Sequence, residues 1–555
     1  MKIKKKVENC KKIIYYMQGE NKKQMKEKIG KYIFITVVSS LIIISLFIFF
    51  KSQNEASNNI SNNTEDNQLK YSKTLNLSIC NYDNINPLVS KNKDVINISK
   101  LIFEPLVTLD ENYRIEYLLA KECAKISDKS YLIKLNTEAK WQDGKNLSSK
   151  DVEFTINELK KIDSIYSEEA KYIEGVEIID EYTLKINLKE KVDFFEYYLD
   201  FPILPYHIYE NEPNILSSQI PIGTGRFKIK TIDSKTIILE KNEYFRKNNE
   251  ENSKIEKINI HLYDNINEAY NNFKLGNIDL IQTGNINYQQ YIGSNFYNIK
   301  EYKGREYDFI SFNCKDNLLN RTEVRKAISY AINKENINSN TYNNQYYISN
   351  FPLDYGSFLY DEDNINYNIN NDEAKKILED NGWNYKNNKW QSKNKNGKTT
   401  ILSLELIVQE SSTKRVKVSE EIKKQLEDIG IIIKINKVSD SEYIKYLENK
   451  NYQIIVTGVN SGINPDLEYF YGNQNLAQYE NEEIINIMKE IPQIEDESLL
   501  KEKYTKIIEI QNKDCPYIGL YRNKEQLILN QNVNGEFVPN NYNIFYKIWT
   551  WYKKI

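Results

Sequence analysis

Side chains that commonly hold metals or act as nucleophiles are scarce in this chain of 555 residues. There are two histidines, His207 and His261, and five cysteines, none of which forms a Cys-x-x-Cys pair. Zinc sites and Cys–His nucleophiles need several such residues at close spacing. The sequence therefore predicts neither a metal site nor a cofactor. We expect the four cysteines after residue 50 to be buried small residues and not a disulfide framework. The cysteines are Cys10, Cys80, Cys123, Cys314 and Cys515.

One glycine-rich stretch, PIGTGRFKIK at residues 221–230, invites comparison with a phosphate-binding loop. It lacks the Gly-Lys-Ser/Thr ending of such loops and leads into a strand pattern where a helix would be needed. The chain also contains no Gly-x-Ser-x-Gly and no His-Glu-x-x-His motif. These absences predict a protein that binds a ligand and is not an enzyme.

The stretch SYLIKLNTEAKWQDGKNLSSKDVEFTINELK has a clear local pattern. Residues 131–135 alternate between apolar and other side chains, which is typical of a strand. Asp143 and Gly144 then form a turn pair, since both tolerate left-handed backbone angles. Ser148 and Asp151 have the spacing of a capping box, and apolar residues at helical spacing follow them. The pattern predicts a strand, a tight turn and a capped helix.

Trp141 lies beside that turn and could either contact a ligand or pack beneath the chain. Nothing in the surrounding residues is catalytic, and a large aromatic ring next to a tight turn usually fills a core. We therefore interpret Trp141 as a structural residue.

Charge is segregated along the chain. Residues 1–31 carry 11 lysines and 3 glutamates, so the rest of the chain has a net charge of about -11. No basic stripe lies in this acidic body, which argues against a nucleic-acid partner. The 43 tyrosines accompany many Asn, Lys and Ile residues. All four types are favoured by AT-rich codons, so we do not interpret the tyrosines as a binding surface.

The basic tail at residues 1–31 precedes an uncharged apolar run, YIFITVVSSLIIISLFIFF, at residues 32–50. About 20 apolar residues can cross a bilayer as a helix, and lysines before the run favour a cytoplasmic N-terminus. We expect a single-pass anchor in the cell membrane, with the body on the extracellular side. A cleaved signal peptide is the alternative, but no small-residue cleavage site follows the run. Residues 51–70 are polar and predict a flexible tether.

Strand and helix patterns alternate from residue 75 onward. Residues 183–188 and 236–242 predict strands. One helical face appears at Val324, Ala327, Ile328, Ala331 and Ile332, and another ends at Gly382. A third, with apolar residues from 418 to 429, ends at Gly430 and precedes a strand at 431–436. The pattern indicates an α/β (α+β mixed) protein with more than one sheet.

Several blocks of the chain, in order, resemble the family 5 extracellular solute-binding proteins, the oligopeptide-, dipeptide- and nickel-binding receptors of ABC importers. KWQDGKNLSSKDV resembles the family's Trp, Asp-Gly and Asp-Val block, and INPLVSKNKDVINISKLIFEPLVTLD resembles its opening. ILPYHIYE, PIGTGRFKIK, LEKNEYF, FKLGNIDLI and NRTEVRKAISYAINKENI resemble later blocks. The resemblance extends from about residue 75 to residue 552. It implies that His207, within ILPYHIYE, is structural.

The resemblance implies a two-lobed periplasmic-binding-protein type II fold with an extra inserted domain, preceded by the transmembrane helix. In such folds the lobes close around a ligand by hinge motion. We expect the following segments: a cytoplasmic tail at 1–31, an anchor at 32–50, a tether at 51–70, a first lobe at 71–102, 224–308 and 524–555, an inserted domain at 103–223, and a second lobe at 309–523.

The resemblance also implies two walls of a peptide-binding cleft. The ligand-binding residues it predicts are Lys91, Asn92, Lys93 and Asp94 on one wall and Gly458, Val459, Asn460, Gly462 and Asp466 on the other. Relatives commonly place an Asp where this chain has Gly462, an Arg at Val456 and a Trp at Val459. The nearest acid is Asp466, which either anchors the peptide's amino group or caps a helix.

The function implied is extracellular capture of peptides and their delivery to a separate ABC permease and ATPase, since no Walker motif is present. An extended peptide offers main-chain groups that a receptor can pair without reading side chains. The same fold could instead bind a nickel chelate, a sugar or another small solute. A membrane-anchored sensor or scaffold without transport is a third hypothesis. We expect a monomer.

Overall fold

The computed structural model describes residues 70–210, 221–248, 253–284, 291, 293–353, 356–360, 369–393 and 397–555. Tyr71–Ile555 forms one compact unit. The predicted tail, anchor and tether lie outside the described residues. Within the described ranges, no helix is both long and apolar enough to cross a membrane. The domain boundaries inside the compact unit stay a prediction, and the names first lobe, inserted domain and second lobe are kept here for their residue ranges.

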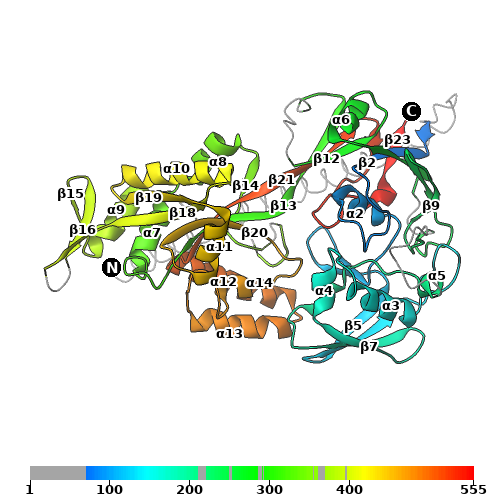
Figure 1. The fold of residues 1–555 in the computed structure, drawn as a ribbon, viewed down its shortest axis with the longest axis horizontal. Helices are drawn as coiled ribbons and strands as arrows, with labels where there is room; N and C mark the ends of the chain where they lie inside the picture. Colours follow the sequence, from blue (N-terminus) through cyan, green and yellow to red (C-terminus); the bar gives the residue numbers. More distant parts are fainter. Residues whose placement is uncertain are drawn as a thin grey trace, which may run out of the picture. The chain divides into compact units, whose positions relative to one another are not determined.

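Four strands form a sheet of the first lobe, in the order β2-β11-β10-β9 (Figure 1). Alternate side chains of β2 are buried, as expected for a strand with one covered face. The predicted strand at 236–242 is confirmed as β10, one residue shorter. A small sheet, β1-β23-β22, joins both ends of the compact unit. The bounds are β1 Tyr71–Ser72, β2 Thr74–Cys80, α2 Lys93–Ser99, β9 Phe227–Ile232, β10 Thr236–Lys241, β11 Lys257–Tyr263, α6 Ile266–Lys274, β22 Val533–Asn534, η5 Ile548–Thr550 and β23 Tyr552–Lys554.

The inserted domain contains an antiparallel sheet in the order β5-β6-β8-β7 and a small pair, β3-β4. The predicted strand, turn and capped helix are confirmed: the capping box of α3 has both of its bonds, with Ser148 N donating to Asp151 Oδ2 at 2.7 Å. The bounds are β3 Val107–Leu109, β4 Ile115–Tyr117, β5 Ala120–Ser127, β6 Ser130–Leu135, α3 Ser149–Leu159, α4 Ser167–Lys171, β7 Ile173–Ile178, β8 Thr183–Leu188, η1 Phe195–Leu199 and α5 Tyr206–Tyr209.

The largest sheet has seven strands, β12-β21-β13-β20-β18-β19 with β14 beside β21. Its long strands β13 and β21 run from the first lobe into the second (Figure 1). A three-stranded sheet, β15-β16-β17, stands apart. The strand bounds are β12 Leu280–Thr283, β13 Tyr297–Phe312, β14 Tyr346–Ile348, β15 Asn384–Lys386, β16 Lys389–Lys393, β17 Thr399–Ile401, β18 Ser403–Gln409, β19 Ile432–Val438, β20 Ile454–Asn460 and β21 Tyr517–Asn530.

Helices of the second lobe cover this sheet. The apolar face predicted through Ile332 is divided, because α7 ends at Ala331 and the side chain of Asn333 caps a new helix by accepting from Asn336 N at 2.8 Å. Gly430 follows α10 with φ of +91°, as predicted for a helix end. The bounds are α7 Thr322–Ala331, α8 Lys334–Tyr342, α9 Asn371–Asp380, α10 Thr413–Asp428, α11 Asp440–Asn449, α12 Glu468–Tyr471, α13 Glu482–Glu490, η4 Ile491–Gln493 and α14 Glu497–Asp514.

The hydrophobic cores of the compact unit do not coincide with its sheets. One continuous core serves both the first lobe and the inserted domain. The second lobe has two cores of its own, and a small fourth core lies around α6. The four cysteines that the structure describes are free thiols. Cys80, Cys123 and Cys515 are buried, as predicted, whereas Cys314 is only partly buried.

The shared core includes Trp141, whose side chain is fully buried. The turn beside it closes through Gly144 N, which donates to Trp141 O at 2.9 Å, and Gly144 has φ of +87°. His207 Nε2 lies 2.8 Å from Asp143 Oδ2, so two of the family blocks meet at this corner. Both side chains thus have structural contacts, as the sequence predicted for the turn and for His207.

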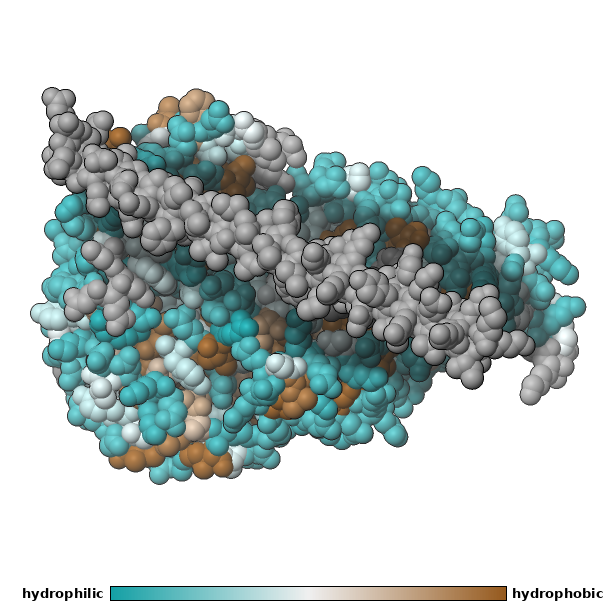
Figure 2. Space-filling model, turned by 180° about the vertical axis from the view of Figure 1, so that it is seen from behind, coloured by the Kyte–Doolittle hydropathy of each residue, from teal (hydrophilic) through white to brown (hydrophobic). Residues whose placement is uncertain are grey.

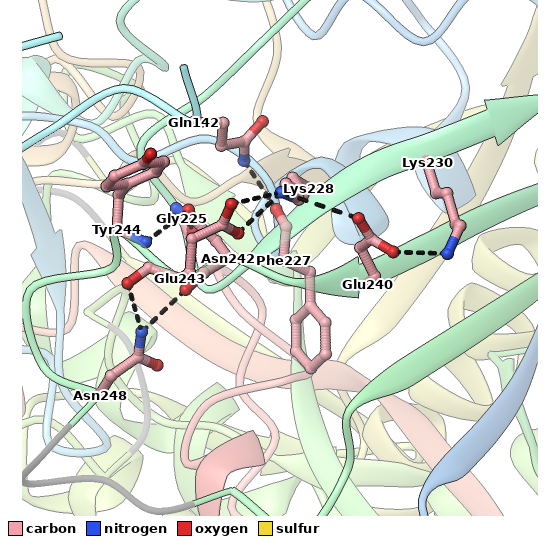
Figure 3. Close-up of polar contacts among 10 residues, drawn as sticks. All are labelled: Gln142, Gly225, Phe227, Lys228, Lys230, Glu240, Asn242, Glu243, Tyr244 and Asn248. Carbon is pink, nitrogen blue, oxygen red and sulfur yellow. Dashed lines mark hydrogen bonds and ion pairs between the residues drawn. The ribbon is translucent and has the colours of Figure 1, made fainter. Parts of the chain in front are cut away.

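Four of the family blocks converge in what we call the joint, formed by Ile102, Gln142, Gly223, Gly225 and Asn242. The Gln142 side chain donates to the carbonyls of Ile102 and Phe227, at 3.2 and 2.7 Å, and its oxygen accepts from Gly223 N at 3.0 Å. Asn242 donates to Gly225 O at 2.8 Å. Figure 3 shows Gln142 reaching Phe227 and Asn242 reaching Gly225, with the ion pair of Lys228 and Glu243 beside them.

The two glycines of the joint permit a close backbone approach. An added Cβ at Gly223 would lie 1.9 Å from Ile102 O, and one at Gly225 would lie 2.7 Å from Ile102 C. Gly225 N donates to Ile102 O at 2.8 Å. The stretch PIGTGRFKIK is therefore a structural crossing between the inserted domain and the first lobe, consistent with the sequence's argument against a phosphate loop.

Side chains on the outer surface are mostly polar. On the face drawn in Figure 2, hydrophilic residues dominate the part that is not grey, and hydrophobic residues form small separate groups. Isolated exposed apolar residues of this kind are normal on a protein surface.

Candidate functional site

A cavity of about 260 Å³ lies between the inserted domain and the second lobe. Its floor is the segment 459–466, which begins in β20 and continues toward α12. Tyr113 and Tyr197 of the inserted domain line it from one side. Leu353, Leu359, Tyr469 and Phe470 of the second lobe line it from the other. Most of the lining is therefore apolar or aromatic, which is typical of ligand sites.

The structure brings most of one predicted wall to this cavity. Val459, Asn460, Gly462 and Asp466 all line it. Gly458 does not, because it faces the buried ion pair between Asp308 and Arg415. A Cβ at Gly458 would lie 2.2 Å from Asp308 Oδ1, so this position has no room for a side chain.

The other predicted wall, residues 91–94, does not line the cavity. Lys91 forms an ion pair with Asp163. Asn92 caps α2 by accepting from Asp94 N at 2.9 Å, and Asp94 Oδ2 accepts from Cys80 N at 3.0 Å. These two side chains stabilise the start of α2, where a polar cap satisfies free backbone donors.

Lys93 extends from the same wall to the strand β21. Its Nζ lies 3.2 Å from Glu525 Oε2, and its side chain is mostly exposed. A pair of this kind contributes little to stability because water screens it. Ligand contact by residues 91–94 stays a prediction.

Asp466 supplies the one charged side chain among the described residues that line the cavity. Its Oδ1 accepts from Glu468 N at 2.9 Å, a turn contact just before α12. No described basic side chain lies within ion-pair distance. The Asp466 side chain is exposed to solvent, yet the surrounding protein partly desolvates it and so raises its pKa above the ordinary value, and the nearby Asp193 raises the pKa further. The carboxylate thus makes a turn contact and does not cap α12, whose N-cap is Leu467, and it also lines the cavity.

Two arginines on the long strands hold the floor of the cavity. Arg305 of β13 donates from Nε and Nη2 to Ser461 O, at 2.9 and 2.7 Å. Arg522 of β21 is fully buried and donates to Ser461 Oγ at 2.6 Å and to Pro352 O and Leu353 O at 2.8 Å. Because both strands run between the ranges named first lobe and second lobe, these contacts tie the floor to the strands that connect the two ranges.

Hydrogen bonds between separate regions border the cavity. Asn464 Nδ2 donates to Tyr198 Oη at 2.8 Å, which links the floor to the inserted domain. Phe358 N donates to Asn112 O at 3.2 Å, and Tyr542 Oη donates to Gly462 O at 3.2 Å. The ligand space is thus bounded by contacts of the inserted domain, the second lobe and the C-terminal segment.

A further contact lies near this border. Arg114 donates to both carboxylate oxygens of Glu497, at 2.8 and 2.9 Å, and its guanidinium lies 4.6 Å from the centre of the Phe358 ring. Two parallel N–H···O bonds fix the geometry of such a pair as well as adding energy. The turn that carries Arg114 also presents Tyr113 to the cavity, with φ of +64°.

The sequence analysis did not find Tyr113, Tyr197, Arg305 or Arg522. The tyrosines stand among 43 in the chain, so their abundance gave no local signal. Tyr113 lies in a short turn, and only the non-glycine left-handed angle, which sequence does not reveal, distinguishes it. Contacts between segments that are 61 to several hundred residues apart in the sequence decide the roles of all four.

Comparisons with known proteins bear on the family and the fold of this chain. Residues 114–481 match the model of the bacterial extracellular solute-binding proteins, family 5 middle. The oligopeptide-binding protein AppA of Bacillus subtilis is 25% identical over 525 residues, which cover 90% of this chain and 95% of that protein.

Solved structures of three similar proteins show the same fold. AppA of Bacillus subtilis in complex with a nonapeptide has 24% identity and a TM-score of 0.56, over 88% of this chain and 100% of AppA. HbpA2 of Haemophilus parasuis has 20% identity and a TM-score of 0.73, over 87% and 100%. NikZ of Campylobacter jejuni in complex with Ni(L-His) has 23% identity and a TM-score of 0.55, over 87% and 99%.

Proposed function

Because this chain belongs to the family 5 extracellular solute-binding proteins, we propose that it captures peptides in the cavity above Val459–Asp466 and delivers them to an ABC permease. AppA, the relative that matches along nearly all of this chain, is an oligopeptide-binding protein. The permease and its ATPase are separate chains, and no Walker motif is present in this one.

The observation that carries the proposal is the placement of Asp466. It is the single charge among the described lining residues, it is negative, and no described basic side chain neutralises it. A peptide's free amino group is protonated at neutral pH, since its pKa is about 8. A charge-assisted bond between the two groups would hold the amino end of a peptide and leave its side chains to the aromatic lining.

Mass spectrometry of the protein purified from its own host tests the cargo. Under non-denaturing conditions we expect a 1:1 complex whose released ligand fragments as a peptide. A released nickel chelate or sugar would replace peptide capture by one of the alternative cargoes. A ligand-free protein that also fails to bind any added peptide would favour the sensor or scaffold hypothesis.

We propose further that residues 32–50 anchor the protein in the cell membrane, with the ligand-binding body outside. The support is a long uncharged run that follows 11 lysines and lacks a small-residue cleavage site. Edman sequencing of the membrane-bound protein should find a start at Met1, Met17 or Met25. A mature start between Ser52 and Asn67 would mean that the segment is a cleaved signal peptide.

A further inference from the structure

We infer that the outer face of the sheet β15-β16-β17 is a contact surface for the anionic lipid headgroups of a membrane. We call this surface the lysine face, and its charged residues are Lys386, Lys389 and Lys393. The inference goes beyond the proposed function, because it concerns a surface outside the cavity and applies whichever cargo the cavity holds.

The lysine face is the uncovered side of a small sheet whose other side is packed. Trp390 of β16 is buried, and its Nε1 donates to Ile429 O at 2.8 Å, at the end of α10. The ring of Tyr385, opposite Trp390 in β15, lies 5.0 Å from the Trp390 ring between centroids. Side chains alternate along a strand, so the exposed Lys389 and Lys393 lie on the side away from Trp390. The strands β15 and β16 project at the end of the second lobe (Figure 1).

A tight hairpin holds two of the lysines next to each other. Asn387 and Asn388 have φ of +51° and +59°, and a type I′ hairpin turn requires positive φ at both positions. The turn places Lys386 directly opposite Lys389, as a cross-strand pair of like charge. Such a pair is destabilising when no opposite charge is near. Among the described residues, the side chains of the three lysines have no ion-pair partner. The lysine face therefore presents positive charge that an external anion can neutralise.

The lysine face differs in charge from the rest of the body. Residues 384–401 contain five lysines and no acidic residue, whereas the chain after residue 31 has a net charge of about -11. The remainder of the body therefore has a net charge of about -16. An anionic surface repels this remainder and attracts the lysine face, so it favours one orientation of the body.

The composition of the lysine face favours lipid over a protein partner. Protein interfaces have an apolar centre and are depleted in lysine. Ile401, at the edge, is the one apolar residue on this face and is 42% exposed. The other neutral residues of the face are Asn384, Gln391 and Thr399.

Lysine also suits the partner that we infer. Its side chain is a compact charge on a flexible stem, so it can follow headgroups that have no fixed arrangement. Anionic lipid surfaces attract clusters of basic residues, and each lysine near the surface strengthens binding by about fivefold. Three lysines on one flat face should together hold the second lobe against such a surface.

Photo-crosslinking of the full-length protein in lipid vesicles tests the contact. The vesicles carry a trace of phospholipid with a photoreactive headgroup, in phosphatidylcholine alone or in an equal mixture with phosphatidylglycerol. Mass spectrometry locates the crosslinked peptides. We expect crosslinks within β15 and β16 in the anionic vesicles and at least about tenfold fewer in the neutral vesicles. High salt should remove them, because it screens exposed charges.

A triple variant with Lys386→Gln, Lys389→Gln and Lys393→Gln should reduce these crosslinks to the level in neutral vesicles. The substitutions remove a like-charge pair, so the sheet should keep its fold. The matched control replaces three exposed lysines that pair with acids elsewhere, and it changes the net charge by the same amount. The control substitutions are Lys134→Gln, Lys315→Gln and Lys506→Gln, whose partners are Glu122, Glu480 and Glu509. They should leave the crosslinks unchanged.

Equal crosslinking in neutral and anionic vesicles, or by the two triple variants, would overturn the inferred lipid contact. Absence of crosslinks within β15 and β16 in the anionic vesicles would also overturn it and would leave an acidic protein as the occupant of the lysine face. Crosslinks within residues 32–50 report on the proposed anchor separately, so a failure of the anchor differs from a failure of this inference in the same experiment.

Discussion

The joint and the cavity are both formed by stretches that resemble family blocks. The stretches at the joint make structural hydrogen bonds, whereas the stretch at the cavity differs from its family block at the expected ligand-binding positions. At the joint, Gln142, Gly223 and Asn242 make hydrogen bonds that hold their segments together. At the cavity, the block that relatives use for ligand anchoring has Gly462 in place of an acid and Val459 in place of a tryptophan.

The two regions have different structural requirements within the same fold. The joint must bring four segments within hydrogen-bond distance, and glycine is the residue that permits a backbone approach as close as that at Ile102. The cavity must complement a ligand. A different ligand can be bound by changing the side chains of the segment 459–466 while its backbone stays the same. Substitutions at the joint should therefore affect folding, and substitutions at the cavity should affect binding.

The largest effect is expected from Trp141→Ala, behind the joint. The ring is fully buried, so its loss should lower the free energy of unfolding by about 3 to 5 kcal/mol. Chemical denaturation measures this, with Trp141→Phe as a milder control. A Trp141→Ala variant that keeps its stability but loses ligand would place Trp141 in the binding site and contradict the structural interpretation.

The next effect is expected from Gly223→Ala within the joint. The added Cβ would lie 1.9 Å from Ile102 O, so the backbone must move, at a cost of about 1 to 3 kcal/mol. Gly175→Ala is the matched control, because nothing lies within 4 Å of a Cβ there. Equal melting temperatures for the two variants would show that the backbone at the joint can move without loss of stability. That result would contradict the view that substitutions at the joint affect folding.

These structural features differ in how far the sequence could predict them. The turn at Asp143-Gly144 and the capping box of Ser148 and Asp151 involve neighbours in the chain, so local pattern was sufficient. The break between α7 and α8 is also local, but the apolar face continues across it and hides the cap at Asn333.

The cavity lay largely beyond local pattern. The floor, Val459 to Asp466, followed from family resemblance, whereas Tyr113 and Tyr197 meet it only because the chain returns across several hundred residues. Residues 91–94 were assigned to a wall by the same resemblance, yet Asn92 and Asp94 are occupied at the start of α2. Resemblance transfers a fold more safely than it transfers a ligand contact.

A smaller effect is expected from pH, and it concerns the cavity alone. The pKa of Asp466 is raised by partial desolvation and by Asp193, so its carboxylate gains a proton at a higher pH than an ordinary aspartate does. The peptide's amino group stays protonated throughout this range. As the pH is lowered, affinity for a free peptide should therefore begin to fall at a higher pH than the titration of an ordinary aspartate would give, and the loss should not exceed that caused by Asp466→Asn.

Calorimetry at a series of pH values measures this change, and an N-acetylated peptide is the control because it has no charge to pair. Parallel losses for both peptides would assign the pH dependence to closure of the cavity or to folding, and not to Asp466.

The most direct test of the account is a double-mutant cycle on the proposed anchor. Wild type and Asp466→Asn are each titrated with a free and an N-acetylated tripeptide. In the wild type, acetylation should weaken binding by about 10- to 150-fold, and Asp466→Asn should weaken the free peptide equally, because each change removes the same charge-assisted bond. In the variant, acetylation should have almost no further effect. Equal binding of both peptides by both proteins would contradict the account and reduce Asp466 to the turn contact it makes with Glu468.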